Sequence, residues 1–224
     1  MLIPSIDIMD GRIVQLIQGQ KKALEFTSYE PWIEKFSSYH LVQVIDLDAA
    51  MQKGNNRLLI EKISKELPCQ VGGGIRSLEA AKAIVEAGAR SVILGSVLVR
   101  DDQPDTQIAE SFFSTLGAER LVFAIDSRAG RVAVHGWQDR TELTPFHMIQ
   151  ILEPWCGAFL YTHIDTEGMM QGIPLEIVRQ LRSATQRRLF VAGGISSQRE
   201  IEELNGLNVD AVVGMAIYTS RLQV

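Results

Sequence analysis

The sequence predicts a single (β/α)₈ barrel, the TIM-barrel form of the α/β class, in which eight parallel strands alternate with helices and close into a ring. Three observations lead to this fold: eight short apolar runs alternate with helix-like segments, the runs are apolar throughout, and the second half of the chain repeats the first. Strands that are apolar on both faces are typical of a parallel sheet covered by helices. Eight such units in 224 residues match one barrel.

The eight expected strands are short, rich in β-branched residues and followed by turn signals. They span residues 2–8, 41–45, 68–71, 91–94, 121–125, 158–161, 189–192 and 211–213. Between them, apolar residues recur at helical spacing and predict helices over residues 77–88, 174–185 and 197–204. Periodicity alone also allows a doubly wound open sheet, so a further observation has to decide between the two folds.

An internal repeat favours the barrel. Shifting the chain by 119 residues places Asp7 on Asp126, and further matches fall at strand ends in the same order. The further matches, at a shift of 119 or 120, are Arg12 with Arg131, Asp46 with Asp165, Asp48 with Glu167, Gly73 with Gly193, and Gly95 with Gly214. Matches of this kind indicate two (β/α)₄ halves, at residues 1–110 and 111–224. We expect the halves to close one barrel, so that residues 1–224 form a single domain.

The composition argues against several functional classes. With 22 basic and 27 acidic residues, the chain carries a formal net charge of −5, which disfavours a protein that coats nucleic acid or an anionic membrane. No stretch reaches the ~18 apolar residues of a membrane span, and the amino-terminal segment lacks the basic residues of a signal peptide. Cys69 and Cys156 and the four histidines show no metal-ligand spacing, so we expect no metal. The expectation is a cytoplasmic enzyme.

Two carboxylates are expected to face each other across the mouth of the barrel. Asp7 and Asp126 close the first and fifth strands, at equivalent points of the repeat. The active site of such a barrel lies at the carboxyl ends of its strands, and a carboxylate there is costly to bury unless it is paired or used. Paired carboxylates are typical of proton abstraction on one face of a substrate and proton donation on the other.

Glycine-rich turns after four of the strands predict two phosphate sites. Glycine lets backbone N–H groups approach an anion closely, and a helix amino terminus beyond the turn adds a favourable dipole. The turns occur as one pair in each half, so we expect an elongated substrate with a phosphate at each end. The candidate residues are Gly73, Gly74, Arg76, Gly95 and Ser96 in the first half, and Gly193, Gly194, Gly214 and Met215 in the second.

Two further segments are expected at the mouth. The segment after the sixth strand supplies Thr162, whose hydroxyl can orient a carboxylate, together with Glu167 and Gly168. The loop after the fifth strand supplies Trp137, whose indole can stack on a heterocycle. The alternative interpretations are a solvated loop acid at position 167 and an indole buried under its own loop at position 137. We expect His163 to be a polar residue of the rim rather than a catalyst.

These motifs together resemble one family of histidine biosynthesis, the phosphoribosylformimino-5-aminoimidazole carboxamide ribotide isomerases. The resemblance covers residues 1 to 218. It rests on residues 3–7 (Ile-Pro-Ser-Ile-Asp), 10–11 (Asp-Gly), 71–76 (Val-Gly-Gly-Gly-Ile-Arg), 136–137 (Gly-Trp), 161–162 (Tyr-Thr) and 192–195 (Ala-Gly-Gly-Ile). It implies a two-fold repeated barrel, a small substrate with two phosphates, and neither a metal nor an organic cofactor.

The resemblance also implies a reaction, the Amadori rearrangement of an N-linked aminoaldose to an aminoketose. A general acid would protonate the furanose ring oxygen, and a general base would then remove the proton from C2. By position, Asp7 is the implied base and Asp126 the opposing acid. The family also has a carboxylate in the segment after the sixth strand, so Glu167 is an equal candidate for the acid. Thr162 would orient the open-chain intermediate.

The chain departs from the family pattern at several positions. Gln15 stands where the family usually has Arg, Gly19-Gln20 replaces Gly-Asp, and His163 and Glu167 replace two aspartates. Moving a catalytic group by ~1 Å can cost about 100-fold in rate. One alternative is therefore a weakened paralogue that only binds a phosphorylated ligand. The other is the paralogous cyclase that makes imidazole glycerol phosphate, which has Lys where this chain has Gln15.

Substrate range and assembly stay open at this point. An isomerase of this kind that also accepts phosphoribosylanthranilate is conceivable, and only kinetics would identify it. Few residues follow the last expected strand, so we expect a short or missing final helix. The apolar flank beside it would be covered by the first helix or by a partner chain. The expected assembly is a monomer or a weak homo-oligomer.

Overall fold

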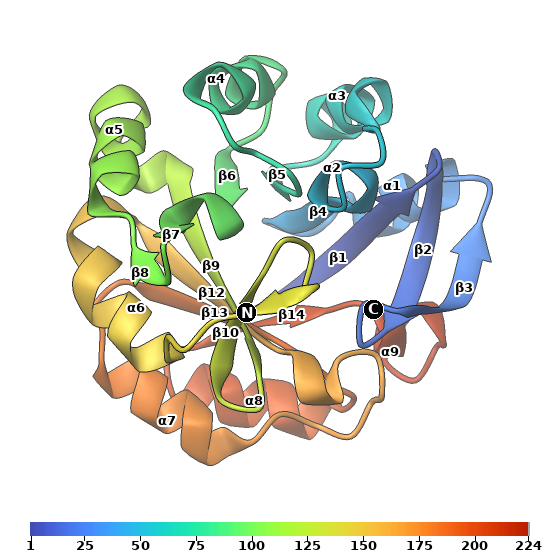
Figure 1. Cartoon of the computed structure of the whole chain (residues 1–224). Helices are drawn as coiled ribbons and strands as arrows, with labels where there is room; N and C mark the ends of the chain where they lie inside the picture. Colours follow the sequence, from blue (N-terminus) through green and yellow to red (C-terminus); the bar gives the residue numbers. More distant parts are fainter. Residues whose placement is uncertain (224) are drawn as a thin grey trace.

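Eight parallel strands close into a barrel in the computed structural model, which describes residues 1–223 (Figure 1). Closure is complete because β1 (Leu2–Met9) pairs with both β4 (Val42–Asp46) and β14 (Asp210–Val213), while β6 (Ser91–Leu94) pairs with β9 (Leu121–Arg128). The other barrel strands are β5 (Cys69–Gly72), β12 (Ala158–His163) and β13 (Arg188–Ala192). Each expected strand coincides with one of these eight. The predicted barrel is therefore confirmed, and the alternative of a doubly wound open sheet is excluded.

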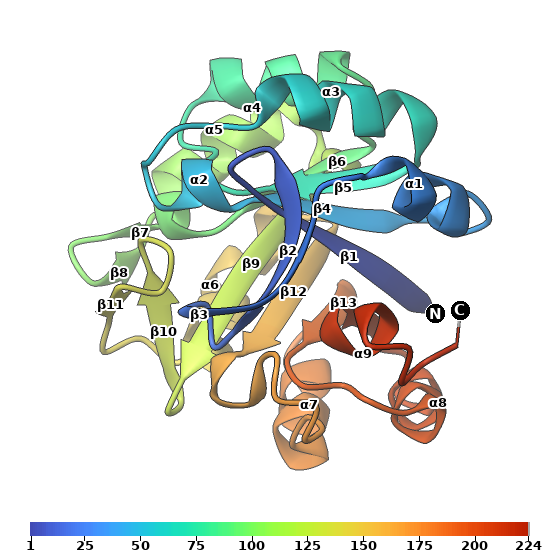
Figure 2. The same ribbon diagram turned by 90° about the vertical axis from the view of Figure 1, so that its right-hand side faces the viewer.

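Helices cover the outside of the barrel, as Figures 1 and 2 show. The three predicted helices are present as α4 (Leu78–Glu86), α7 (Leu175–Ser183) and α8 (Gln198–Gly206). Two of them begin at a serine cap, because the Oγ atoms of Ser77 and Ser197 accept the N–H groups of Ala80 and Glu200. Within residues 1–223, every helix is too short or too polar to cross a membrane. The helices are α1 (Glu30–Phe36), α2 (Leu47–Ala50), α3 (Arg57–Glu66), α4 (Leu78–Glu86), α5 (Thr106–Leu116), α6 (Pro145–Leu152), α7 (Leu175–Ser183), α8 (Gln198–Gly206) and α9 (Met215–Tyr218).

Two antiparallel extensions stand where the sequence predicts loops. After β1 the chain turns back as β2 (Arg12–Ile17), which pairs with β1 and with β3 (Lys21–Phe26). After β9 it turns back as β10 (Arg131–Val134), which pairs with β9 and with β11 (Asp139–Arg140). A further two-stranded piece joins β7 (Val99–Arg100) to β8 (Gln103–Pro104). The first two extensions occupy equivalent places in the two halves, and both reach over the barrel mouth.

The apolar core has two layers, because strand residues point alternately into the barrel and toward the helices. The outer layer, between strands and helices, is the larger one and includes Phe36, Phe112, Phe123 and Phe159. The inner layer fills the barrel with Ile3, Leu41, Ile93, Val122, Ala158, Leu160, Phe190, Ala192 and Val212. The barrel is thus a packed core with its open space at the mouth.

The repeat is present, but two of its predicted matches, Asp46 with Asp165 and Asp48 with Glu167, were wrong by two residues. Gly73 and Gly193 are equivalent, and a Cβ on either one would overlap the backbone of a residue at the end of the neighbouring strand. That residue is Asp46 in the first half and His163 in the second. Asp46 therefore corresponds to His163, not to Asp165.

Hydrogen bonds give the same correction. The backbone N–H of Asp10 donates to Asp48 Oδ2 (2.7 Å), and the N–H of Ala129, 119 residues later, donates to Asp165 Oδ2 (2.9 Å). Asp48 therefore corresponds to Asp165, and both aspartates hold the turn after the first strand of their half. Glu167 has no acidic counterpart in the first half, since the corrected shift of 117 places it on Ala50.

The flank beside α9 is covered from within the chain. The ring of Tyr218 on α9 lies 4.2 Å from that of Trp32 on α1 and 5.4 Å from that of Phe26 on β3 (centroid distances). This outcome agrees with the first of the two expected coverings, the one by the first helix. Of these three rings, Tyr218 is buried, whereas Phe26 and Trp32 are partly buried.

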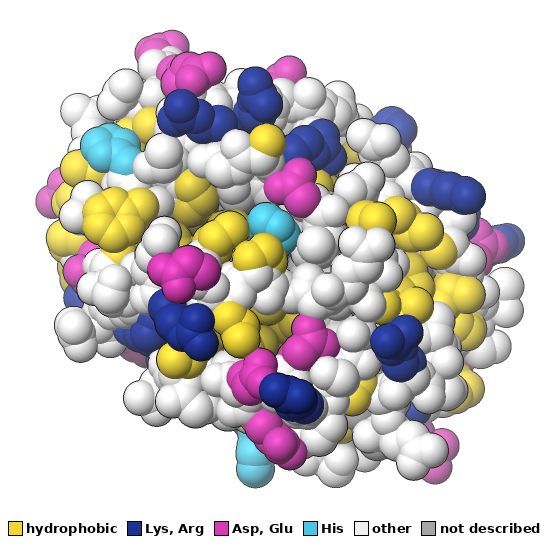
Figure 3. Space-filling model, turned by 90° about the horizontal axis from the view of Figure 1, so that it is seen from below, with side chains coloured by type: hydrophobic (Ala, Val, Ile, Leu, Met, Phe, Trp, Pro, Cys, Tyr) yellow, Lys and Arg dark blue, Asp and Glu magenta, His cyan; other side chains and the backbone are white. Residues whose placement is uncertain are grey.

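Charged side chains of both signs are interspersed on the face shown in Figure 3, and hydrophobic side chains form only separate groups there. Neighbouring opposite charges on the outer helices include Arg199 with Glu203 (3.0 Å) and Arg179 with Glu176 (3.8 Å). Exposed pairs of this kind contribute little to stability, about 0–1 kcal/mol each.

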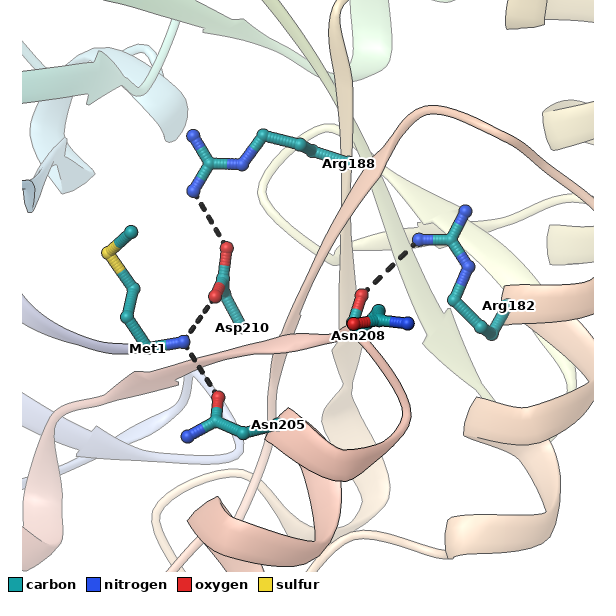
Figure 4. Close-up of polar contacts among 6 residues, drawn as sticks. All are labelled: Met1, Arg182, Arg188, Asn205, Asn208 and Asp210. Carbon is teal, nitrogen blue, oxygen red and sulfur yellow. Dashed lines mark hydrogen bonds and ion pairs between the residues drawn. The ribbon is translucent and has the colours of Figure 1, made fainter.

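The end of the barrel opposite the mouth is held by polar contacts (Figure 4). The amino group of Met1 bonds to Asp210 and, at 2.7 Å, to Asn205 Oδ1. Arg188 donates to the other oxygen of Asp210 (2.7 Å). These contacts lie at the amino ends of β1, β13 and β14, where residues of this fold serve stability rather than chemistry.

Candidate active site

A cavity opens at the carboxyl ends of the barrel strands. Every residue selected from the sequence as catalytic or phosphate-binding lines it: Asp7, Gly73, Gly74, Arg76, Gly95, Ser96, Asp126, Trp137, Thr162, Glu167, Gly168, Gly193, Gly194, Gly214 and Met215. The structure therefore brings together residues that are spread over more than 200 positions of the chain. Ser5, Gly19 and Gln43 also line the cavity and were not selected.

Asp7, near the carboxyl end of β1, points into the cavity from one side. Its Oδ1 accepts a hydrogen bond from Ser5 Oγ at 3.0 Å. Burial raises the pKa of Asp7 to about 6, although the Ser5 hydroxyl partly offsets this rise because it stabilises the ionised form. At pH 7 the group is mostly ionised and still basic enough to take a proton.

Asp126 lies at the equivalent place on β9. Its Oδ2 accepts a hydrogen bond from the indole Nε1 of Trp137 at 2.7 Å. Burial raises the pKa of Asp126, and the Trp137 indole and the Thr162 hydroxyl both act in the opposite direction. Because an indole N–H can only donate, this contact favours the carboxylate form of Asp126.

Glu167 follows β12 and is the third acid of the cavity. Burial and the negative charges of Asp7 and Asp126 raise its pKa to about 8, partly offset by the backbone N–H of Gly168. Three carboxyl groups near one another cannot all ionise easily, so one of them retains a proton at neutral pH. The Glu167 side chain is that group. Glu167 is partly buried and lines the cavity, which argues against the alternative of a solvated loop acid.

Trp137 reaches the cavity from the turn between β10 and β11. His135, Gly136 and Trp137 all have left-handed backbone angles, with φ of 55°, 66° and 66°. This turn projects the indole inward until its ring lies against Gly19 of the β2–β3 turn, where any Cβ would overlap it. The indole is therefore exposed to the cavity and also fixed by Gly19 and Asp126.

The glycine turns after β5 and β13 require glycine for two reasons. Gly73, Gly74, Gly193 and Gly194 have positive φ angles of 99°, 68°, 120° and 79°. A Cβ on Gly73 or Gly74 would also overlap the backbone of Asp46 or Ala49, and the turn after β13 is equally tight. Such close backbone approach leaves N–H groups at the cavity wall, where an anion can be bound.

Two candidate phosphate ligands already have partners within the protein. The guanidinium of Arg76 donates to the carbonyl oxygens of Ala49 and Ala50, each at 3.1 Å. The hydroxyl oxygen of Ser96 accepts the backbone N–H of His135 at 2.7 Å. Both contacts join the loops around the mouth.

Two of the departures from the family pattern lie outside the cavity lining. His163 is buried on the outer side of β12, with Nδ1 3.1 Å from the hydroxyl of Tyr161, so the expectation of a rim residue was wrong. Inward and outward positions alternate along a strand, and Thr162 takes the inward one. Gln15 is buried beside Gly214, close enough for its Oε1 to overlap a Cβ placed there.

Among residues 1–223, no group of three or more His, Cys, Asp and Glu side chains is arranged to hold a metal ion. The fold and the site define a class, a (β/α)₈ barrel whose mouth gathers three carboxyl groups between glycine-rich turns. The chain belongs to the histidine biosynthesis protein family, whose model matches residues 1–223.

Relatives of known name span nearly the whole chain. A protein of Methanocaldococcus jannaschii is 34% identical over 97% of this chain and 93% of its own length. A protein of Archaeoglobus fulgidus is 35% identical over 99% and 94%, and one of Aquifex aeolicus is 33% identical over the same shares. All three are named 1-(5-phosphoribosyl)-5-((5-phosphoribosylamino)methylideneamino)imidazole-4-carboxamide isomerase.

Proposed function

We propose that this protein is an aldose–ketose isomerase of histidine biosynthesis, acting on the bis-phosphorylated aminoimidazole carboxamide ribotide for which its relatives are named. The observation that carries the proposal is the set of carboxyl groups at the mouth. Asp7 and Glu167 have raised pKa values, about 6 and about 8, that bracket neutral pH. One group is therefore ready to take a proton while the other is ready to give one.

In the proposed mechanism, protonated Glu167 gives its proton to the furanose ring oxygen, and the C1–O bond breaks to leave an open-chain Schiff base. Ionised Asp7 then removes the proton from C2, and the C2–H electron pair forms the enolamine. The enolamine becomes the aminoketose when C1 gains the proton held by Asp7 and the C2 hydroxyl gives its proton to Glu167, so both carboxyl groups return to their starting forms. Hydrogen bonds to carboxyl groups and hydroxyls, in particular Thr162, hold the open chain in place.

Of the two candidates for the acid, the surroundings favour Glu167 over Asp126. Asp126 accepts hydrogen bonds from Trp137 and Thr162, and both favour its ionised form. An ionised Asp126 also raises the pKa of Glu167, which keeps the acid protonated. In this assignment Asp126 assists the acid and orients the substrate through Thr162.

The two ends of the substrate would occupy the two pairs of glycine turns. One phosphate would lie against the turns after β5 and β6, and the other against those after β13 and β14, where α9 begins at Met215 directly after Gly214. Trp137, which also lines the cavity, would stack on the imidazole carboxamide.

The test is an absorbance assay of the purified protein with the aminoaldose substrate, coupled to the downstream cyclase. We expect turnover without added metal or cofactor, and no turnover when the coupling enzyme alone is present. Product formation from the aminoketose with ammonia, and none from the aminoaldose, would instead identify the paralogous cyclase. Binding of the bis-phosphate without turnover would identify a ligand-binding paralogue.

A further inference from the structure

A chain of buried polar side chains runs across the barrel interior below Asp7. Ser5 Oγ donates to Asp7 Oδ1 (3.0 Å), Gln43 Nε2 donates to Ser5 Oγ (3.5 Å), and Gln70 Nε2 donates to Gln43 Oε1 (3.0 Å). The three residues stand on the neighbouring strands β1, β4 and β5, where Ser5 is in register with Gln43 and Gln43 with Gln70. All three are buried, with exposed fractions of 6%, 6% and 0%.

The direction of this chain follows from the carboxylate at its end. Ionised Asp7 can only accept hydrogen bonds, so the Ser5 hydroxyl must donate to it. The Ser5 oxygen then accepts from the Gln43 amide nitrogen, which leaves the Gln43 oxygen to accept from Gln70. Every donor in the chain thus points toward Asp7, an arrangement in which successive hydrogen bonds polarise one another.

The second half of the barrel shows that the fold does not require polar residues at this level. Its equivalents of Ser5, Gln43 and Gln70 are Ala124, Leu160 and Phe190, in the same register on β9, β12 and β13. These three side chains are apolar and make no hydrogen bond. The polar chain therefore belongs to the carboxylate of the first half alone.

The hydrogen-bonded series of Ser5, Gln43 and Gln70 also costs folding stability, and packing does not explain why it is present. Gln70 Oε1 is buried without a hydrogen-bond donor among the residues that the structure describes. A buried acceptor that lacks a partner destabilises the folded protein. An apolar side chain, as at the equivalent Phe190, would avoid that cost.

We propose that Ser5, Gln43 and Gln70 are positioning residues that fix the Asp7 carboxylate in the cavity and favour its ionised form. The inference rests on the proposed function, in which Asp7 is the base. It explains why equivalent aspartates have different roles: Asp7 receives its hydrogen bond from below and keeps its other oxygen open to the cavity. Asp126 is instead held by Trp137, from the cavity side.

Other titratable groups near Asp7 come from three elements. Glu167 follows β12 and interacts electrostatically with Asp7, as does Tyr218 on α9, whose hydroxyl donates to the Ser5 carbonyl oxygen at 3.1 Å. Asp126 lies across the mouth on β9. Burial and the Ser5 hydrogen bond are the two influences that set the pKa of Asp7.

The test is a direct titration of Asp7 in the ligand-free protein, followed by carboxyl carbon NMR and assigned with Asp7→Asn. Glu167→Gln serves as the background, so that the neighbouring acid does not titrate. We expect Ser5→Ala to raise the Asp7 midpoint by about one pH unit, because a donor to the charged form is lost. Gln43→Leu, which copies the second half, should raise it less, and Gln70→Leu least.

Two controls separate positioning from packing. Ser5→Thr keeps the hydroxyl and should restore the midpoint, whereas Ala124→Ser adds a hydroxyl at the equivalent place in the other half and should leave Asp7 unchanged. With Glu167 present, the acidic limb of kcat/KM should move in the same order. An unmoved midpoint in Ser5→Ala would overturn the proposal, as would variants that lose kcat with the acidic limb in place.

The titration needs no substrate, so the two proposals fail separately. If the Asp7 midpoints shift in the expected order but the protein does not turn over the aminoaldose, the proposed isomerase function is refuted and the positioning role of Ser5, Gln43 and Gln70 stands. If turnover depends on Asp7 but the Asp7 midpoint does not change in Ser5→Ala, the positioning role is refuted and the isomerase function stands. Should Gln43→Leu fail to fold, the pair Ser5→Ala and Ser5→Thr decides.

Discussion

At the scale of single residues, the three carboxyl groups of the mouth differ through their neighbours rather than through their chemistry. Asp7 has a hydroxyl donor below it, Asp126 has an indole donor beside it, and Glu167 has two negative charges facing it. The first two contacts favour the ionised form and the third favours the protonated form. This ordering is what acid–base catalysis at neutral pH requires.

The ordering predicts a bell-shaped pH profile of kcat/KM. Activity should fall below about pH 6, because Asp7 gains a proton there, and above about pH 8, because Glu167 loses one. Since the two groups interact, the limbs report the pair rather than each residue. Steady-state kinetics from pH 5 to 9 measure the profile. In Glu167→Gln the basic limb of the profile should disappear, and the rate should fall by about 10²–10⁴-fold.

Glu167 should also lower the free energy of unfolding at neutral and alkaline pH. Its pKa is about 4.5 in the unfolded chain and about 8 in the folded protein, so folding stability declines as pH rises through this range and is constant beyond it. Glu167→Gln removes the ionisable group, and we expect it to raise the free energy of unfolding by about 2 kcal/mol at pH 8 and by little at pH 5. Urea unfolding at both values checks this. An equal effect at the two pH values would count against a buried, protonated Glu167.

At the scale of elements, the extensions β2–β3 and β10–β11 meet over the mouth. The backbone N–H of Gln18 donates to the Glu167 carbonyl oxygen (3.0 Å), and Gly19 supports the Trp137 ring. Arg128 donates to the carbonyl oxygens of Gln18 and Trp137, both at 3.4 Å. Closure of the mouth therefore depends on contacts between two elements far apart in the chain.

Gly19 and Gly11 offer a matched pair of substitutions at this scale. Their φ angles are 70° and 71°, so alanine at either position costs similar backbone strain, about 1 kcal/mol. Only Gly19 touches the Trp137 ring, whereas a Cβ on Gly11 would meet no atom within 4 Å. We expect Gly19→Ala to displace the indole, change tryptophan fluorescence and lower kcat/KM about 100-fold. Gly11→Ala should lower stability without changing kcat/KM. An equal fall in kcat/KM in both variants would contradict a role for the contact between Gly19 and the Trp137 ring.

The sequence predicts elements and strand ends well, and contacts between them poorly. Eight apolar runs, with a repeat of their end residues, suffice to place Asp7 and Asp126 on opposite sides of one cavity. The β2–β3 extension was not expected, because its β3 strand is largely exposed and polar and so lacks a periodic apolar signal. The match of Asp48 with Glu167 failed because the loop lengths of the two halves differ, and only the backbone register reveals this.

At the scale of the whole molecule, the two halves share a backbone and differ in what fills it. The equivalent levels of the barrel hold Ser5, Gln43 and Gln70 in one half and apolar residues in the other. Gln43 and Gln70 are polar residues within apolar runs, and this is the sequence feature that could have identified them. Periodicity alone does not predict their role. The repeated fold thus supplies two equivalent aspartates, and the unequal surroundings give them different chemistry.

The most direct test of this account is the turnover of the aminoaldose by Asp7→Asn, compared with the wild-type protein under identical conditions. Asparagine is isosteric with aspartate but cannot accept the C2 proton. We predict a fall in kcat of about 10²–10⁴-fold with substrate binding retained, because only the base is lost. Full turnover by a folded Asp7→Asn protein would contradict the account.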